Sequence, residues 1–417
     1  MNFTKRYVFP AIAATVLLSM GLAGCARSSG NTTATAAPDP GITDTQISLG
    51  TIMPLSGPVA APGTQALAGL QAYFDAANAN GGITFGDGKT RKVDLKSYDD
   101  GYDPARAAAD FRQEIAEGKF ANVGTLGTPN NLAIMPLAKS EKMPSVLLQS
   151  GSDLLSIDQK ANPWVIGFLP TQRSEGLAFG KYLASLGKPV TIAVLQQNDD
   201  AGQNYVDGLT EGIKGSQAKI VATATFAVTD PTVDAQMSKL ADSKADFFFE
   251  ANPQPNLAPQ SILKAQQLGW LPEIFLPSAV SDKRQSLGPG NASAFPGVYS
   301  TVFSKNPNVA EFANEADVVQ FNADIKKYAP ANVSANTIGQ AVWGYQIGAT
   351  MKAAFEKMKT PTRQALMDAI HQLKGIKLPL ALDGVTLDAT SRTASPLNDG
   401  LKLEKYDFSA NKYNVIG

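Results

Sequence analysis

Residues 122–152, NVGTLGTPNNLAIMPLAKSEKMPSVLLQSGS, contain a complete strand–helix–strand unit. Hydrophobic periodicity predicts a strand over Asn122–Leu126, a helix over Asn130–Ser140 and a strand over Ser145–Gln149. Both strands lead into glycine and hydroxyl residues, Gly127-Thr128 in one case and Ser150-Gly151-Ser152 in the other. Parallel strands joined by a helix end at the same edge of their sheet, so we expect these hydroxyls to lie close together.

The same alternation continues on both sides of this unit. Further predicted strands are Ile47–Ile52, Val93–Tyr98, Val190–Gln196, Ile220–Phe226, Asp246–Glu250 and Ile274–Pro277. Predicted helices are Thr64–Asn80, Ala105–Glu117, Glu175–Leu186, Gly202–Ile213, a helix opened by Asp230-Pro231 that runs to Ser243, and Leu257–Leu268. The pattern predicts an α/β protein with mostly parallel sheets flanked by helices.

The last third of the chain departs from this alternation. Helices are predicted over 311–329, 336–358 and Thr362–Leu373, and strand-like segments over Leu380–Leu382, Val385–Leu387 and Leu401–Phe408. Repeated segments of short period are not found, and the length suits two or more domains of ~100–200 residues.

The N-terminus has the layout of a secretory signal. Lys5 and Arg6 precede an apolar run over Ala11–Met20, which is too short to span a bilayer. Leu22-Ala23-Gly24-Cys25 resembles a lipobox, and Cys25 is the only cysteine in the chain. We therefore predict a signal peptide over 1–24 and a lipid-modified Cys25 at the start of a flexible tether over 25–44. This places the mature protein outside the cytoplasm, anchored by lipid to the cell membrane. The alternative is a plain signal peptide in which Cys25 is incidental.

Composition excludes several kinds of function. The 36 Lys and Arg residues balance 37 Asp and Glu residues, so no basic stripe for nucleic acid is expected. His371 is the only histidine and is assigned to helix packing rather than to a metal or a catalytic base. The sequence predicts no cofactor, no metal site and no enzymatic activity.

Two clusters have an alternative chemical interpretation. The acidic residues Asp99, Asp100 and Asp103 lack the spacing of an EF-hand calcium loop and are better explained as a strand-end loop and a helix cap. Ser150 and Ser152 lie outside any Gly-x-Ser-x-Gly motif, which leaves an anchored serine hydrolase as a weak alternative.

The strand-end hydroxyls suggest a binding site. Ligands of open α/β sheets bind outside the carboxyl ends of the strands, where helix N-termini offer unpaired N–H groups. Thr128, Ser150 and Ser152 would add neutral donors there, which suits a carboxylate or another oxygen-rich anion. Ordinary helix capping by the same residues is the alternative.

Several motifs, in order and spacing, resemble the leucine/isoleucine/valine-binding family of periplasmic binding proteins over about residues 45–410. They are Ile47–Gly63 (ISLGTIMPLSGPVAAPG), Ala77–Ile83 (ANANGGI), Tyr98–Ala105 (YDDGYDPA), Val123–Thr128 (VGTLGT), Asn162–Phe168 (NPWVIGF), Asp230–Asp246 and Val342–Gly348 (VWGYQIG). The resemblance implies a type I fold of two lobes joined by three hinge crossovers. It assigns 45–168 plus 301–375 to the first lobe and 169–300 plus 376–417 to the second. It also implies a monomer that delivers solute to the permease and ATPase subunits of an ABC importer; a sensor with the same fold is the alternative.

The ligand-binding positions of the family match this sequence only in part. Thr128, Ser150 and Ser152 match positions that hold the ligand carboxylate, whereas cleft tyrosines are replaced at Pro62 and near Ala201 and Gln254. Closure about the crossovers is expected to bring Gln172, Asp200, Gln254 and Ser278 against the solute. The predicted ligand-binding residues are Pro62, Thr128, Ser150, Gly151, Ser152, Gln172, Asp200, Ala201, Gln254, Ser278 and Ala279.

The acid that pairs with an amino group in the family is expected within Leu276–Val280, where no carboxylate occurs. A buried ammonium without a partner is costly. We therefore expect either a ligand other than a simple branched-chain amino acid or another acid, with Glu250, Asp199 and Asp200 as candidates. The ligand classes, in order of preference, are an aromatic or aliphatic carboxylate, an amino acid in a rearranged site, and an amide or urea-like solute.

Overall fold

The computed structural model describes residues 37–416 apart from 157, 255, 282–291, 331–332, 334–338, 398–399 and 411. The predicted signal peptide, Cys25 and most of the tether lie outside the described residues. Within the described part, no helix combines the length and the apolar character needed to cross a bilayer.

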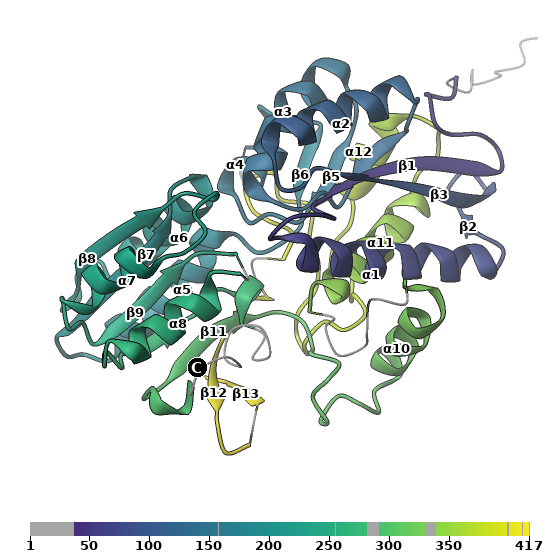
Figure 1. Ribbon diagram of the computed structural model, residues 1–417. Coiled ribbons are helices and arrows are strands. Elements are labelled where there is room, and N and C mark those ends of the chain that lie inside the picture. Colours follow the sequence, from purple (N-terminus) through teal and green to yellow (C-terminus); the bar gives the residue numbers. More distant parts are fainter. Residues whose placement is uncertain are drawn as a thin grey trace, which may run out of the picture. The chain divides into compact units, whose positions relative to one another are not determined.

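The first sheet has the order β2-β3-β1-β4-β5-β6, and its strands are parallel except for the β2–β3 pair (Figure 1). The strands are β1 (Gln46–Met53), β2 (Ile83–Thr84), β3 (Thr90–Asp99), β4 (Ala121–Val123), β5 (Ser145–Leu148) and β6 (Val165–Gly167). One face is covered by α1 (Ala60–Ala79) and α11 (Gly339–Phe355), and the other by α2 (Pro104–Ala116) and α3 (Thr128–Glu141). We call this sheet and its helices, with α4 (Asp153–Ser156), α10 (Ala316–Tyr328) and α12 (Arg363–Ile370), the first lobe.

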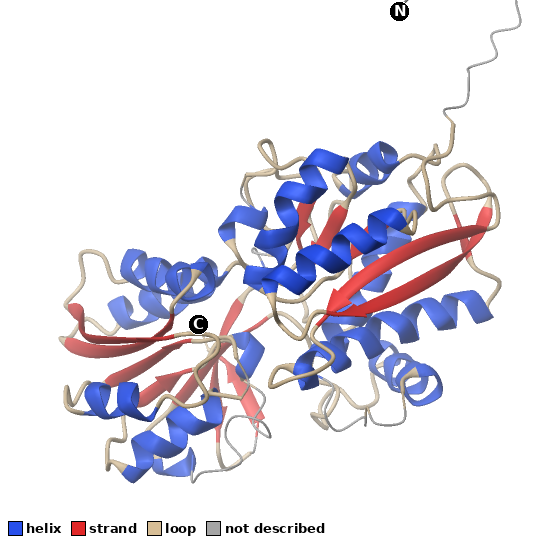
Figure 2. Cartoon of the chain, turned by 45° about the horizontal axis from the view of Figure 1, so that its top comes forward, coloured by secondary structure: helices blue, strands red, loops and turns tan. Residues whose placement is uncertain are grey.

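The second sheet has the order β13-β12-β11-β10-β9-β7-β8. Its strand pairs are parallel except for β11–β12 and β12–β13, which are antiparallel. The strands are β7 (Val190–Gln197), β8 (Ala218–Phe226), β9 (Phe247–Ala251), β10 (Glu273–Phe275), β11 (Val298–Val302), β12 (Lys402–Asp407) and β13 (Lys412–Val415). Its helices are α5 (Gln172–Ser185), α6 (Asp200–Gly212), α7 (Asp234–Ala241) and α8 (Ala258–Gln267). We call this sheet and these helices the second lobe; Figure 2 shows helices on both faces of each sheet.

The alternation of side chains along the strands explains why both faces of the second sheet are covered. Ile192 and Phe249 pack with α5 and α6, whereas their neighbours Ala193 and Phe248 pack in a separate cluster with α7 and α8. Successive strand residues point to opposite faces, so a strand that is apolar at every position needs a helix layer on each side. The predicted alternation of strands and helices therefore forms two units, each with a sheet between two helix layers.

The chain passes from one lobe to the other at three places: near residues 168–171, near 303–305, and between Leu397 and Lys402. The third crossover was predicted earlier in the chain, between residues 375 and 376. Residues 376–417 were assigned to the second lobe, yet Leu378, Leu387 and Leu397 are buried in the core of the first. The return to the second sheet is made only by β12 and β13. The apolar side chains before residue 397 are better buried against α11 and α12 than at the edge of the second sheet.

Three local predictions were also wrong. The segments at 380–387 form isolated bridges, Ser304 with Ala381 and Ile376 with Leu387, instead of strands. The helix expected at Asp230 begins at Asp234, because the Asp230 carboxylate accepts a hydrogen bond from the backbone N–H of Ala227 and closes a turn. The strand β13 (Lys412–Val415) was not predicted from the sequence.

Phe179 of α5 provides a test of the second lobe. Its ring lies 4.7 Å from that of Phe275 and 5.9 Å from that of Phe249, and its side chain is fully buried. Phe179→Ala should reduce the free energy of unfolding in urea by about 3–5 kcal/mol, because it leaves a cavity among the rings. Val221→Ala, at a side chain that is 48% exposed, should change it by less than about 0.5 kcal/mol. Equal effects of the two substitutions would contradict this packing.

Candidate ligand-binding site

Each sheet has a point at which the strand order reverses, between β1 and β4 in the first lobe and between β7 and β9 in the second. The loops that leave neighbouring strands diverge there, which opens a crevice at the carboxyl ends. A cavity of about 70 Å³ lies at these ends, and both lobes line it. Its first-lobe residues follow β1, β3, β4, β5 and β6 or lie on α11. Its second-lobe residues follow β9 and β10 or lie on α5 and α6.

The cavity has a mixed lining without any lysine, arginine or histidine among its described residues. They are Val59, Pro62, Tyr102, Leu126, Gly127, Thr128, Gln149, Ser150, Gly151, Leu169, Pro170, Gln172, Glu175, Tyr205, Pro253, Gln254, Ser278, Ala279, Gln340 and Trp343. Glu175 is the only acidic residue in this set.

The first-lobe wall is built by two hydroxyls. Thr128 is the first residue of α3 and Ser150 follows β5, and their Oγ1 and Oγ atoms lie 2.7 Å apart in a hydrogen bond. Gly127 precedes them with φ 110°, and a Cβ there would approach the Tyr102 ring to 2.7 Å, so glycine is required at this turn. A register shift between Val146 and Leu148 redirects the end of β5 toward Thr128.

These hydroxyls leave one hydrogen for a ligand. Thr128 Oγ1 accepts from Gln172 Nε2 at 3.3 Å, and Ser150 Oγ accepts from the backbone N–H of Ser152 at 3.2 Å. One of the two hydroxyl hydrogens joins Thr128 to Ser150, so the other is free to donate. The first turn of α3 adds N–H groups that have no partner within the helix. At Thr128, Ser150 and the start of α3, the first-lobe wall therefore offers hydrogen-bond donors.

The second-lobe wall is organised by the buried carboxylate of Glu175, in the first turn of α5. Its Oε2 accepts from the Ser278 N–H at 2.8 Å and from Thr301 Oγ1 at 2.5 Å. Its Oε1 accepts from Ser278 Oγ at 3.1 Å and from the Tyr205 hydroxyl at 3.3 Å. Burial raises the pKa of Glu175, and the hydrogen bonds from these donors oppose that shift.

Two further side chains contribute unsatisfied acceptors to the cavity. Gln149 donates through Nε2 to the Gly124 carbonyl at 2.8 Å, and Gln172 donates to Thr128. The Oε1 atoms of both glutamines are buried and have no hydrogen-bond partner among the described residues. A buried acceptor left in this state costs about 1–3 kcal/mol, which a donor on the ligand would offset.

The structure brings together eight of the eleven predicted site residues. The residues that line the cavity are Pro62, Thr128, Ser150, Gly151, Gln172, Gln254, Ser278 and Ala279. Ser152, Asp200 and Ala201 do not line it. Ala201 is fully buried. The helix α6 begins at Asp200, so Ala201 is its second residue and packs inside the second lobe.

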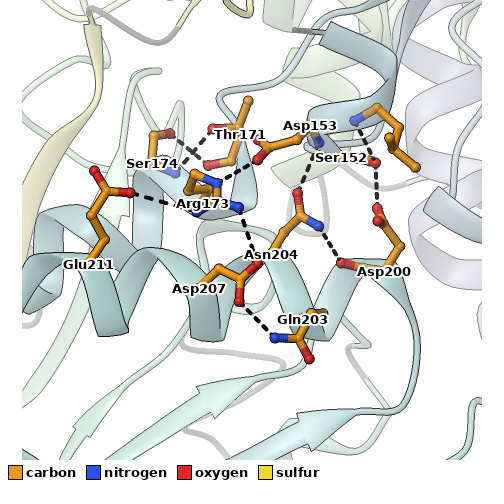
Figure 3. A network of polar contacts seen from close by, with 11 residues as sticks. Ser152, Asp153, Thr171, Arg173, Ser174, Asp200, Gln203, Asn204, Asp207 and Glu211 are labelled. Carbon is orange, nitrogen blue, oxygen red and sulfur yellow. Dashed lines mark hydrogen bonds and ion pairs between the residues drawn. The ribbon is translucent and has the colours of Figure 1, made fainter. Parts of the chain in front are cut away.

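Ser152 and Asp200 instead belong to a network that links α4 of the first lobe to α5 and α6 of the second (Figure 3). Ser152 Oγ donates to Asp200 Oδ2 at 2.5 Å, and the Asp153 N–H donates to Asn204 Oδ1 at 3.0 Å. Arg173 donates to Asp153 Oδ2 at 2.6 Å and to an oxygen of Asp207 at 3.1 Å. We call these contacts the α4–α6 network. It joins the lobes beside the cavity.

The acids proposed to replace the missing carboxylate lie elsewhere. Asp199 caps α6 and accepts from Gln197 Nε2, and Glu250 accepts from Asn252 and Ser261 inside the second lobe. Neither they nor Asp200 lines the cavity; Glu175 does. Sequence reasoning missed Glu175 because acids are common in the first turn of a helix, where they stabilise the helix dipole. Tyr102, Gln149, Tyr205, Gln340 and Trp343 were missed as well and carry no sequence signal that separates them from core residues.

A larger hollow of about 1010 Å³ adjoins the cavity and shares Ser278, Ala279, Gln340 and Trp343 with it. It lacks Thr128, Ser150 and Glu175, and it is bordered by segments next to residues 282–291 and 334–338, which are not described. We therefore place the recognition of polar groups in the smaller cavity. At ~10–15 Å³ per water, that cavity holds roughly five non-hydrogen atoms, and the remainder of a longer solute can extend into the hollow.

Other predicted features have structural roles. Asp103 caps α2 through hydrogen bonds from the N–H groups of Ala105 and Arg106, as predicted. His371 ends α12, and its Nδ1 lies 3.1 Å from the Ala389 carbonyl oxygen. Among the described residues, no three His, Cys, Asp or Glu side chains converge to hold a metal ion.

Comparison with known proteins gives concordant results. The family model described as periplasmic binding protein matches residues 46–397. The leucine-specific-binding protein of Salmonella typhimurium is 23% identical over 275 residues, which cover 65% of this chain and 70% of the relative. The Leu/Ile/Val-binding protein of Escherichia coli K12 is 21% identical over 228 residues, 55% of this chain and 60% of the relative.

Solved structures share the fold. The fatty acid ABC transporter substrate-binding protein from Thermomonospora curvata superposes with a TM-score of 0.74 at 19% identity, covering 91% of this chain and 93% of the other. An ABC transporter solute-binding protein from R. palustris, in complex with benzoate, gives a TM-score of 0.69 at 17% identity, covering 89% and 96%. At these identities the likeness establishes the type I fold.

Glu250 predicts how stability depends on pH. Burial raises its pKa from 4.5 to about 7. The folded state therefore holds this proton more tightly than the unfolded state, so the free energy of unfolding should fall as pH rises from about 4.5 to 7. Glu250→Gln should remove about 3 kcal/mol of that fall, measured by urea unfolding at pH 5 and pH 8. Exposed Glu141→Gln should leave the fall unchanged; an unchanged slope in Glu250→Gln would show that Glu250 is not destabilised by burial.

Proposed function

The chain belongs to the periplasmic binding protein family, and we propose that it captures a small carboxylate-bearing or amino-acid-like solute for an ABC importer. The cavity at the strand ends of the two lobes is the proposed binding site. Delivery would be to the permease and ATPase subunits of the importer. The protein would act outside the cytoplasm, anchored to the cell membrane through a lipid on Cys25, as the N-terminal sequence predicts.

The observation that carries this proposal is the first-lobe wall. The Thr128 and Ser150 hydroxyls, 2.7 Å apart, lie beside the N-terminus of α3, which bears a partial positive charge. A carboxylate can be held there by a hydroxyl hydrogen and by backbone N–H groups without a cationic side chain. This agrees with a lining free of lysine, arginine and histidine among the described residues. A carboxylate ligand is also consistent with the benzoate bound by the R. palustris protein and with the leucine bound by the Salmonella typhimurium relative.

Closure of the lobes would complete the site. Gln172 of the second lobe already donates to Thr128 of the first, and the α4–α6 network connects the lobes beside the cavity. A solute that contacts both walls binds the closed arrangement better than the open one, and can therefore shift the protein toward closure. Hydrogen bonds in a desolvated cleft of this kind suffice for micromolar affinity, about −8 kcal/mol.

Thr128→Val tests the carboxylate position. The substitution keeps the shape and removes the hydroxyl, so affinity for any carboxylate found by a thermal-shift screen should fall by about 10- to 150-fold, from ~1.5–3 kcal/mol per hydrogen bond to a charged group. Thr350→Val removes a buried hydroxyl that donates to the Gln346 carbonyl at 2.8 Å outside the cavity, and should leave affinity unchanged. The same loss in both variants, or in neither, would place the carboxylate elsewhere.

Ser152→Ala tests the α4–α6 network. Because Ser152 binds Asp200 rather than lining the cavity, its loss should weaken closure and not recognition. We expect affinity to fall by about fivefold, from ~1 kcal/mol for one hydrogen bond, and by the same factor for every solute that binds. Isothermal titration with two solutes measures both factors; unequal factors would show direct contact between Ser152 and the solute.

A further inference from the structure

We infer that Gln340 closes a passage from the cavity into the adjoining hollow and thereby limits the length of the solute that the protein binds. This inference rests on the proposed function and adds a size limit to the choice of carboxylate. Gln340 lies in the first turn of α11 in the first lobe. Its Nε2 donates at 3.0 Å to the carbonyl oxygen of Ala279, which follows β10 of the second lobe.

A partition separates the cavity of about 70 Å³ from the hollow of about 1010 Å³. Among the described residues, four line both spaces: Ser278 and Ala279 of the short helix η1 (Ser278–Val280), and Gln340 and Trp343 of α11. Gln340 and Trp343 are three positions apart on one helix, so they lie on the same face. The hydrogen bond from Gln340 to Ala279 joins the α11 side of the partition to the η1 side.

Three of the four residues are held firmly by other contacts. Ser278 binds Glu175 through both its N–H and its hydroxyl. The ring of Trp343 stacks on that of Phe303, with 5.7 Å between the centroids and 19° between the planes. Ala279 packs against the apolar clusters of both lobes and contributes its backbone carbonyl to the partition. A solute that outgrows the cavity cannot displace these groups without breaking several contacts at once.

Gln340 is the movable part of the partition. Its side chain is unbranched and flexible, and within the described chain its amide makes one hydrogen bond, the one to Ala279. The residue is only 6% exposed, so the amide fills space between the two lobes instead of extending into solvent. Breaking one hydrogen bond of this kind changes an equilibrium by about fivefold. A longer solute therefore reaches the hollow only by displacing Gln340, at a cost in affinity.

The hollow beyond the partition suits an apolar chain. Phe303, Phe312 and Val342 line it, and Phe303 stacks on Trp343 of the partition. Its lysines are already bound: Lys305 to Glu315 and Asp317, Lys402 to the Asp383 carbonyl, and Lys412 to Glu311. Burial raises the pKa of Glu404, which also lines the hollow, to about 8, so this carboxyl is mostly uncharged at pH 7. The end of a solute that passes Gln340 is therefore expected to be apolar.

Unbranched acids of increasing length test the passage. One series runs from propionate, which has the roughly five non-hydrogen atoms that the cavity holds, to decanoate. A second series runs from alanine to α-aminodecanoate, because the proposed function admits amino acids. Affinities are measured by isothermal titration. In the wild-type protein, decanoate should bind no more tightly than butanoate, since the added methylenes must displace Gln340.

Gln340→Ala removes the amide and one methylene and should open the passage. Each methylene that enters the hollow then adds about fourfold in affinity, so the ratio of decanoate to butanoate affinity should rise at least tenfold above the wild-type ratio. The matched control is Gln346→Ala. Gln346 is a buried glutamine of the same helix that donates to the Pro379 carbonyl at 2.9 Å and lines neither space, so the ratio should stay unchanged. If Gln340→Ala does not fold, Gln340→Ser decides, because it shortens the same side chain.

The two proposals fail differently. A gain in Gln340→Ala that levels off at heptanoate would show that the substitution only enlarged the cavity by the volume of the lost atoms, and would overturn the passage. A wild-type affinity that already rises steadily to decanoate, or an equal change in Gln346→Ala, would overturn it as well. Each of these results leaves the proposed function intact, because short acids still bind. Failure of every acid in both series to bind the wild-type protein and the variants would overturn the carboxylate site on which both proposals depend.

Discussion

The carboxyl ends of parallel strands lie at one edge of their sheet, and this constraint brings together the hydroxyls on the first-lobe wall of the cavity. Thr128 and Ser150 are 22 positions apart in the chain, yet their oxygens meet because β4 and β5 are neighbouring parallel strands. The second sheet repeats the arrangement with the segments after β9 and β10. The helices α3 and α5, which follow β4 and β6, begin beside the cavity, so their first turns supply N–H groups on one wall and Glu175 on the other.

The two walls divide the chemistry between them. The first lobe offers a hydroxyl hydrogen and helix N–H groups, which suit an oxygen anion. The second lobe offers oxygens, because Glu175 holds the hydroxyl hydrogens of Ser278 and Tyr205, and Gln149 Oε1 adds one acceptor on the first-lobe side. Because no described residue of either wall is a cation, binding depends on hydrogen bonds in a desolvated cavity.

The lobes are joined both inside and outside the cavity: Gln172 donates to Thr128 within it, whereas the α4–α6 network lies beside it. The α4–α6 network uses Ser152, Asp153 and Arg173 with partners on α6, and none of these three residues lines the cavity (Figure 3). Only Gly151 lies between Ser150 and Ser152, and the two side chains serve different purposes: one faces the cavity and the other faces Asp200. A substitution in the α4–α6 network can therefore change the strength of closure without changing a residue that lines the cavity.

The sequence by itself determined the α/β alternation, the strand ends that carry Thr128 and Ser150, and the cap at Asp103, because hydrophobic periodicity and capping are local properties. Tertiary structure decided what no local pattern encodes. Residues 376–397 joined the first lobe because their apolar side chains are buried there, and Ser152 turned to Asp200 because α6 lies beside α4. Glu175 looked like any acid in a first helical turn until folding brought it to Ser278, 103 positions away. A carboxylate acquires its role from the donors that surround it, and those donors come from segments that only the folded chain brings together.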